Sequence, residues 1–181
     1  RITIGTLGFL LISLTLCCTL MIYVSKKNML NSTTSYTKTE LEKLVANFYT
    51  NKSDIESTVE ELTAETKLKY YFFKQTQYSD SDTEYVLQCG DEIIYNDSGL
   101  DAPTILGLNE DKSNIEMQGE TKSDIVHTEG ADYYICGVDI NINDRIYQVC
   151  IVRDITELYR QIYRMIALCV GIGIVISLAA A

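Results

Sequence analysis

The chain has 181 residues, with 15 lysine and arginine residues against 25 aspartate and glutamate residues, and a formal net charge of −10. This length suits about one folded domain. The acidic balance argues against nucleic acid as a partner, because nucleic-acid binding needs a basic surface. A single histidine leaves almost no material for Ser/His/Asp catalysis or a multi-histidine metal site. The composition therefore points away from a soluble enzyme.

Two apolar runs lie at the ends of the chain. Residues 2–24 contain no charged side chain and would form about 34 Å of helix, enough to cross a bilayer core of about 30 Å. Tyr23 and the pair Lys26–Lys27 follow, as interfacial aromatics and cations do. This run exceeds a signal-peptide core and no A-x-A site follows it, so a membrane anchor is the better interpretation.

The second apolar run covers residues 165–181 and follows a belt of tyrosine and arginine side chains. Position 1 is not a methionine and the run continues to Ala181, so we expect a segment of a longer protein. The two spans would bracket residues 25–162, which hold all 25 acidic residues. We expect this acidic loop to lie outside the cell, although a loop so long crosses largely regardless of its charge.

Helical patterns open the loop. Four apolar residues follow the i, i+3, i+4, i+7 spacing of a helix, namely Leu41, Leu44, Val45 and Phe48. Ser53 and Glu56 form a capping box, which predicts a second helix with an apolar stripe of Ile55, Val59 and Leu62. Residues 67–78 then switch to aromatic side chains, which favour a strand.

Strand patterns dominate the rest of the loop. Residues 84–89 and 92–95 predict two strands around the turn at Gly90, and Asp101 is the predicted N-cap of a short helix that runs to about residue 108. Three further strands are expected at 123–128, 132–140 and 145–152, with a turn at 141–144. Asp154 and Glu157 can then cap a helix that continues into the second apolar run.

This order of elements between two spans resembles the extracytoplasmic PAS-like (PDC, or single Cache) sensor region of membrane sensor histidine kinases of Gram-positive bacteria. The motif-like parts are residues 133–137 and the run at 153–158, Arg-Asp-Ile-Thr-Glu-Leu. The resemblance implies an α+β fold, with a long N-terminal helix on an antiparallel sheet of about five strands, flanked by two transmembrane helices. The implied divisions are a first span at 1–24, a sensor domain at 25–154, a signalling helix at 155–164 and a truncated span at 165–181.

The resemblance also implies a function for the last helix. It would relay a signal from the final strand into the second span, through Asp154, Ile155, Glu157, Leu158, Ile162 and Met165. The fragment itself would be no enzyme, because the kinase core, which would act on a response regulator, would lie beyond residue 181. A chemoreceptor or a cyclic-dinucleotide enzyme could use the same input, and a membrane-anchored assembly protein without a ligand is a rival hypothesis.

Two groups of residues are candidates for ligand binding. The resemblance places four polar side chains around a small-ligand pocket: His127, Tyr134, Arg145 and Tyr147. Arginine could bind a carboxylate there, although surface or structural roles are the alternative. Asp80, Asp82 and Glu84 alternate through a turn and could attract a divalent cation or a cationic peptide. Their spacing matches no EF-hand, so a solvated acidic surface is the alternative, and no other cofactor is expected.

The six cysteines divide between the spans and the predicted strands. Cys136 and Cys150 would be nearly opposite across the last hairpin, so a disulfide depends on their register, and buried free thiols are the alternative. Paired carboxylates such as Asp132 and Asp139 would be needed for a third hypothesis, an extracellular hydrolase. Three Asn-x-Ser/Thr sequons, at Asn31, Asn51 and Asn96, are expected to be chance.

Apolar helix stripes leave two interpretations open. The stripe of Leu41, Val45 and Phe48 and the stripe from Ile155 to Met165 could each pack on the chain's own sheet. In the resembling receptors, membrane-proximal helices instead pair in a homodimer. Ala167 and Gly171 would allow two backbones to approach closely within the second span. We therefore expect a homodimer.

Overall fold

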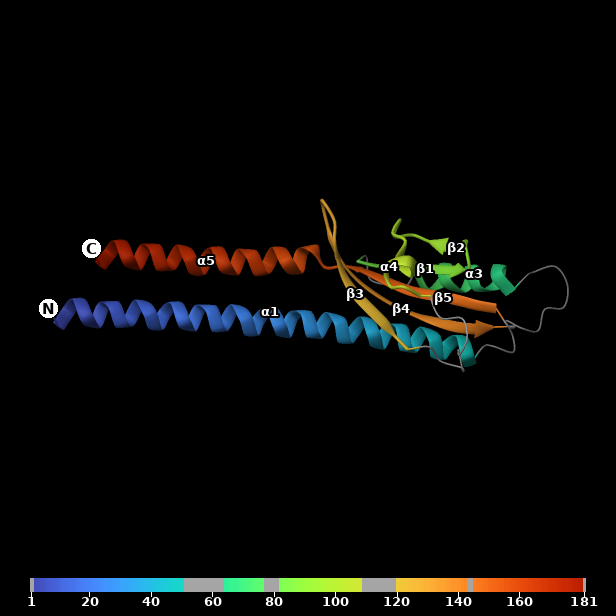
Figure 1. The fold of residues 1–181 in the computed structure, drawn as a ribbon, viewed down its shortest axis with the longest axis horizontal. Coiled ribbons are helices and arrows are strands. Elements are labelled where there is room, and N and C mark those ends of the chain that lie inside the picture. Colours follow the sequence, from blue (N-terminus) through green and yellow to red (C-terminus); the bar gives the residue numbers. More distant parts are fainter. Residues whose placement is uncertain (1, 51–63, 77–81, 109–119, 143–144, 181) are drawn as a thin grey trace. The chain divides into compact units, whose positions relative to one another are not determined.

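The computed structural model describes residues 2–50, 64–76, 82–108, 120–142 and 145–180. The chain forms two compact units. One unit is Thr34–Ile155, and the other combines Arg1–Thr33 with Thr156–Ala181. The elements, labelled in Figure 1, are α1 (Ile2–Thr50), α3 (Ala64–Thr76), β1 (Thr83–Cys89), β2 (Glu92–Asn96), α4 (Ala102–Ile105), β3 (Lys122–His127), β4 (Asp132–Ile142), β5 (Arg145–Asp154) and α5 (Thr156–Ala180).

An antiparallel sheet of five strands, in the order β2-β1-β5-β4-β3, forms the centre of the unit Thr34–Ile155. The long N-terminal helix and this sheet confirm the α+β prediction. All five strands lie close to their predicted ranges, with β4 and β5 each extended at its C-terminal end. Gly90, at a φ of 61°, makes the tight β1–β2 turn, a conformation that glycine adopts without a steric penalty.

Helix α1 contributes its apolar stripe to the core of this unit. Leu41, Leu44, Val45 and Phe48 are each at most 5% exposed. The stripe therefore packs within the chain's own core, and the alternative that Leu41, Val45 and Phe48 face a second copy is wrong. The second predicted helix, with the capping box at Ser53 and the stripe Ile55, Val59 and Leu62, lies outside the described residues.

The strand predicted at residues 67–78 is wrong, because residues 64–76 form helix α3. Leu68 and Phe72, one helical turn apart, are both fully buried. Phe72 stacks on Phe48 with ring centroids 5.2 Å apart and meets the edge of Tyr85 at 6.2 Å. Packing against α1 and β1 thus overrides the strand preference of the aromatic side chains, a preference that depends strongly on context.

The opposite face of the sheet carries α4 and a second apolar cluster. Its buried members are Val86, Ala102, Leu106, Leu108, Ile135, Cys150 and Val152. Gly137 leaves the space that this cluster fills, since a Cβ there would lie 2.7 Å from Sγ of Cys150 and 2.8 Å from Cδ1 of Leu106. Asp101 occupies the predicted N-cap position, but its side chain forms no capping hydrogen bond, so that part of the prediction is wrong.

Asn96 closes the turn that follows β2. Its Oδ1 accepts hydrogen bonds from the backbone N–H of Ser98 (3.1 Å) and Gly99 (3.0 Å) and from the Ser98 hydroxyl (2.9 Å). Its Nδ2 donates to the carbonyl oxygen of Leu100 at 3.0 Å. The carboxamide therefore holds both ends of the turn, as asparagine side chains commonly do.

In the unit of Arg1–Thr33 and Thr156–Ala181, the first part of α1 and helix α5 contact each other. The Ser25 hydroxyl donates to Sδ of Met165 at 3.9 Å, and Nζ of Lys26 lies 5.7 Å from the centroid of the Tyr159 ring. Ile162 is buried, with 3% exposed. Within the described residues, the segment Thr156–Ile176 of α5 is long and apolar enough to cross a membrane.

Candidate functional site

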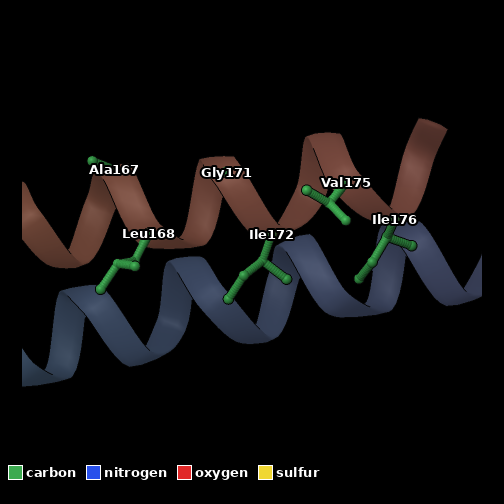
Figure 2. Close-up of a pocket in the computed structure, with 6 residues that line it drawn as sticks. All are labelled: Ala167, Leu168, Gly171, Ile172, Val175 and Ile176. Atoms are coloured by element: carbon green, nitrogen blue, oxygen red, sulfur yellow. The ribbon is translucent and has the colours of Figure 1, made fainter. Parts of the chain in front are cut away.

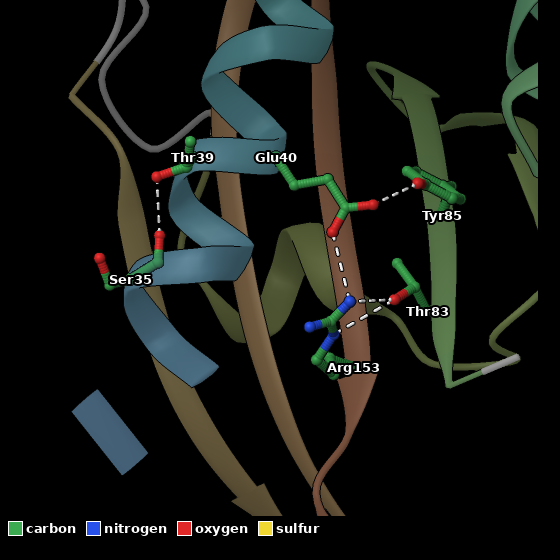
Figure 3. A network of polar contacts seen from close by, with 6 residues as sticks. All are labelled: Ser35, Thr39, Glu40, Thr83, Tyr85 and Arg153. Carbon is green, nitrogen blue, oxygen red and sulfur yellow. Dashed lines mark hydrogen bonds and ion pairs between the residues drawn. The ribbon is translucent and has the colours of Figure 1, made fainter. Parts of the chain in front are cut away.

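A polar network connects α1 to strands β1 and β5 (Figure 3). We call Tyr36, Glu40, Thr83, Tyr85 and Arg153 the Arg153 network. Nη2 of Arg153 donates to Oγ1 of Thr83 at 2.6 Å and to Oε2 of Glu40 at 3.3 Å. The Tyr85 hydroxyl donates to Oε1 of Glu40 at 2.9 Å. Both carboxylate oxygens of Glu40 are therefore held by strand residues.

Local structure brings these side chains together. Thr83 pairs directly with Arg153 in the β1–β5 ladder, so the two side chains share a face of the sheet. Glu40 lies on the inward stripe of α1, directly before Leu41, and Tyr36 lies one turn earlier. The Tyr36 ring lies under the guanidinium, with Cζ of Arg153 4.6 Å from the ring centroid.

Burial makes the network stronger than an ordinary surface ion pair. The side chains of Arg153 and Glu40 are only 12% and 22% exposed. Exposed ion pairs contribute at most about 1 kcal/mol, whereas hydrogen bonds to charged groups that are partly shielded contribute about 1.5–3 kcal/mol. One cation and one carboxylate face each other, so the network leaves no unbalanced charge. It fastens the last strand to the long helix.

The predicted relay residues follow this network along the chain. Asp154 ends β5, and its backbone N–H donates to the carbonyl oxygen of Asp82 at 3.0 Å. The N–H of Ile155 donates to the carbonyl oxygen of Asp132 at 2.8 Å, and its side chain is buried. Helix α5 begins at Thr156. The strand that Arg153 fastens thus passes directly into α5.

On α5 the other relay residues divide between two faces. Glu157 accepts hydrogen bonds from Arg160 at 2.5 Å and Arg164 at 3.3 Å, and all three side chains are exposed. Ile162 is buried, while Leu158 and Met165 are half-buried. The apolar members therefore pack inside their own unit, and the charged ones face outward.

The four predicted ligand-binding residues do not form one pocket. Nδ1 of His127 lies 2.5 Å from Oδ1 of Asp132 at one end of β4, whereas Arg145 pairs with Ile142 at the other end, about 33 Å away at about 3.3 Å per residue. Tyr134 and Tyr147 are both buried core residues. Burial raises the pKa of the Tyr134 hydroxyl. The prediction that these side chains gather around a ligand is therefore wrong.

Of the predicted cation-binding residues, Asp80 lies outside the described residues. Asp82 is exposed and Glu84 is half-buried. Partial burial, followed by the nearby charges of Asp97 and Asp154, raises the pKa of Glu84. Among the described residues, no three His, Cys, Asp or Glu side chains converge closely enough to hold a metal ion.

Cys136 and Cys150 are free thiols, and the register explains why. Cys136 pairs with Ile151, and Cys150 pairs with Gly137, so the two thiols point to opposite faces of the sheet. The two positions are nearly opposite across the hairpin, as expected, but the offset of one position excludes the disulfide. Burial raises the pKa of Cys136 to about 11 and raises the pKa of Cys150 as well.

Ala167 and Gly171 lie on an exposed face of α5 (Figure 2). They line a shallow apolar groove of about 480 Å³ together with Leu168, Ile172, Val175 and Ile176. A Cβ added at Gly171 would meet no atom within 4 Å, so the groove is open at its centre. The close approach of a second helix at Ala167 and Gly171 stays a prediction.

Asp132 and Asp139, the carboxylates of the hydrolase hypothesis, point to opposite faces of β4, because an odd number of positions separates them. They cannot act on one substrate.

No protein-family model and no curated protein matches the chain.

The sequence-based reasoning missed Glu40 and assigned no role to the Arg153 side chain. The signal was present in the periodicity. Glu40 falls on the helical stripe of Thr37, Leu41 and Leu44, and Arg153 continues the inward-facing alternation of Val149 and Ile151. A single charge on each of two apolar faces indicates a buried ion pair.

Proposed function

We propose that this chain is the extracytoplasmic signal-sensing input module of a two-component sensor histidine kinase. In this proposal α1 and α5 cross the membrane, and residues 25–162 lie outside the cell. The chain itself carries no enzymatic activity and passes its signal to a kinase core. Support comes from the α+β fold that the family resemblance implied and from the candidate span at Thr156–Ile176.

The Arg153 network is the observation that carries the proposal. A signal that shifts β5 against α1 has to stretch the contact between Glu40 and Arg153 or move both elements together. Because β5 continues into α5, either response changes the force that β5 exerts on the candidate span Thr156–Ile176. Such a device needs two arrangements that a ligand binds unequally.

A homodimer completes the proposal. The open groove around Gly171 accepts the ridge of a second α5 helix, as small residues spaced by four commonly do in membranes. At about 100° per residue, Ala167 and Gly171 lie on the side of α5 opposite to Ile162 and Cys169. The stripe of exposed charged residues at Glu157, Arg160 and Arg164 continues the same side.

A chimaeric kinase tests the proposal. Residues 1–181 are fused to the linker helix and catalytic core of a characterised sensor kinase, and autophosphorylation is measured in membrane vesicles. Glu40→Gln and Arg153→Lys should change the basal rate several-fold, because lysine cannot reproduce the forked contacts of arginine. Glu42→Gln, an exposed charge on the same helix, should leave the rate unchanged.

The topology is measured separately. A Glu129→Cys variant, in the exposed β3–β4 turn, should react with a membrane-impermeant maleimide in intact cells, with the unsubstituted chain as background. Labelling only after permeabilisation would place the domain on the wrong side. Unchanged autophosphorylation in both network variants would instead favour a membrane-anchored assembly protein.

A further inference from the structure

A cavity of about 620 Å³ lies between α1 and α5, within the unit formed by Arg1–Thr33 and Thr156–Ala181. It is separate from the Arg153 network and from the groove around Gly171. Leu14, Cys18 and Ile22 line it from α1, and Cys169, Val170 and Gly173 line it from α5. Gly173 widens it, since a Cβ there would meet no atom within 4 Å. Small-molecule sites commonly have volumes of about 300–1,000 Å³.

Two thiols meet in this cavity. Cys18 enters from α1 and Cys169 from α5, and the two thiols lie close enough to interact electrostatically. The register of the helix pair supports this contact, because Ser25 meets Met165 further along the same two helices. The neighbouring Cys17 is exposed and does not line the cavity.

The two thiols also lie at similar distances along their helices from the nearest cationic side chains. At about 1.5 Å per residue, Cys18 lies about 12 Å along the helix from Lys26, and Cys169 lies about 8 Å from Arg164. If these cations mark the membrane surface, both thiols lie in the same leaflet, below the headgroups. A water-soluble oxidant then has no direct access, whereas a molecule dissolved in the bilayer does.

The cavity wall selects apolar ligands. The hydroxyls of Thr15 and Thr19 also line it, but they donate to the carbonyl oxygens of Ile12 and Thr15, each at 2.9 Å, within their own helix. Because these hydroxyls already donate within their own helix, they have no hydrogen to donate to a polar ligand. The surface that a ligand would contact is therefore apolar, apart from the two sulfur atoms. A flat, lipid-soluble molecule that accepts two electrons and two protons suits this combination.

We propose that Cys18 and Cys169 are a reversible dithiol–disulfide site, oxidised by a lipid-soluble quinone that enters this cavity. This proposal rests on the proposed function, since it requires both helices to lie in the membrane. Two S–H bonds break and one S–S bond forms, and the two protons and two electrons convert the quinone to its hydroquinone. Reduction by a dithiol reverses the step.

The disulfide gives the input module a second signal. It ties α1 to α5 covalently at one depth, so the two helices can no longer slide past each other. The reduced pair leaves them held by packing alone. The redox state of the bilayer would thus set how freely the helix pair moves.

The test uses the full chain in lipid nanodiscs. A short-chain ubiquinone analogue is added, free thiols are then alkylated, and disulfide-linked peptides are identified by mass spectrometry. The expected product is an intramolecular Cys18–Cys169 disulfide in most chains. Cys17→Ser should form it to the same extent, whereas Cys18→Ser and Cys169→Ser should lose it completely. Oxidised glutathione, which stays in water, should give at least ten-fold less.

A parallel oxidation with copper–phenanthroline distinguishes a failure of the quinone proposal from a failure of the α1–α5 helix pair. A Cys18–Cys169 link with this reagent but none with the quinone would overturn the redox site and leave the helix pair intact. No link with either reagent would overturn the helix pair as well, and with it the membrane arrangement of the proposed function. Linkage through Cys17 in place of Cys18 would also contradict the proposal.

Discussion

Glu40 and Arg153 are separated by 113 positions in the chain, and their side chains form an ion pair with an Nη2–Oε2 distance of 3.3 Å. One belongs to the helix that opens the domain and the other to the strand that closes it. The pair therefore joins the two ends of the folded unit, and its strength can be measured.

Glu40→Gln should lower the free energy of unfolding by about 1–3 kcal/mol, because the partly buried guanidinium then lacks its counter-charge. Urea unfolding of the detergent-solubilised chain, followed by tyrosine fluorescence, measures this change. Glu42→Gln serves as the matched control and should change the value by at most about 0.5 kcal/mol. Equal effects of the two substitutions would show that the ion pair contributes no more than a surface charge.

Gly137→Ala should destabilise the domain by about 1–3 kcal/mol, because the new methyl group would overlap Sγ of Cys150 and Cδ1 of Leu106. Gly130→Ala is the control, since a Cβ at that position meets nothing within 4 Å. The urea midpoints of both variants give the comparison. A domain as stable as the wild type in Gly137→Ala would mean that the α4 cluster is looser than its distances indicate.

Phe72 and Phe73 are neighbours with opposite environments, one fully buried and the other 51% exposed. Phe72→Ala should cost about 3–5 kcal/mol, as large-to-small core substitutions do. Phe73→Ala should cost much less. Thermal unfolding of the two variants measures the difference, and the reverse order of stabilities would contradict the packing of α3.

The raised pKa of Glu84 predicts a pH dependence of stability. The carboxyl of Glu84 binds its proton more tightly in the folded chain than in the unfolded chain. At low pH the carboxyl is protonated in both states and does not lower the free energy of unfolding. As pH rises through the raised pKa, ionisation of Glu84 lowers the free energy of unfolding. Glu84→Gln should therefore have a higher Tm than the wild type at pH 7 and the same Tm near pH 4. An equal difference in Tm between Glu84→Gln and the wild type at both pH values would contradict this prediction.

The strands were predictable because their pattern is local. Runs of apolar and β-favouring residues placed β4 and β5 to within a few residues, and the turn at Gly90 placed the first hairpin. Helix α3 was not predictable from its aromatic side chains alone. Tyr70, Tyr71, Phe72 and Phe73 favour strands, and contacts with distant residues such as Phe48 and Tyr85 select the helical periodicity.

The candidate site was harder to predict for the same reason. The inward positions of Glu40 and Arg153 could each be predicted from the local sequence. That these two side chains pair with each other depends on where α1 packs on the sheet, which the local sequence does not specify. The Cys136–Cys150 prediction failed on register, because a shift by one position moves a side chain to the other face. His127 and Arg145 were grouped by similarity to a family, although the length of β4 separates them.

The turn at Asn96 has a consequence for producing this protein in other hosts. Asn96, Asp97 and Ser98 form an acceptor sequence for N-linked glycans, yet the amide nitrogen and the serine hydroxyl that a glycosyltransferase must reach are both committed inside the turn. A sugar attached before folding would exclude the carboxamide from its place. In a eukaryotic secretory pathway, glycosylation at this asparagine would therefore compete with formation of the turn.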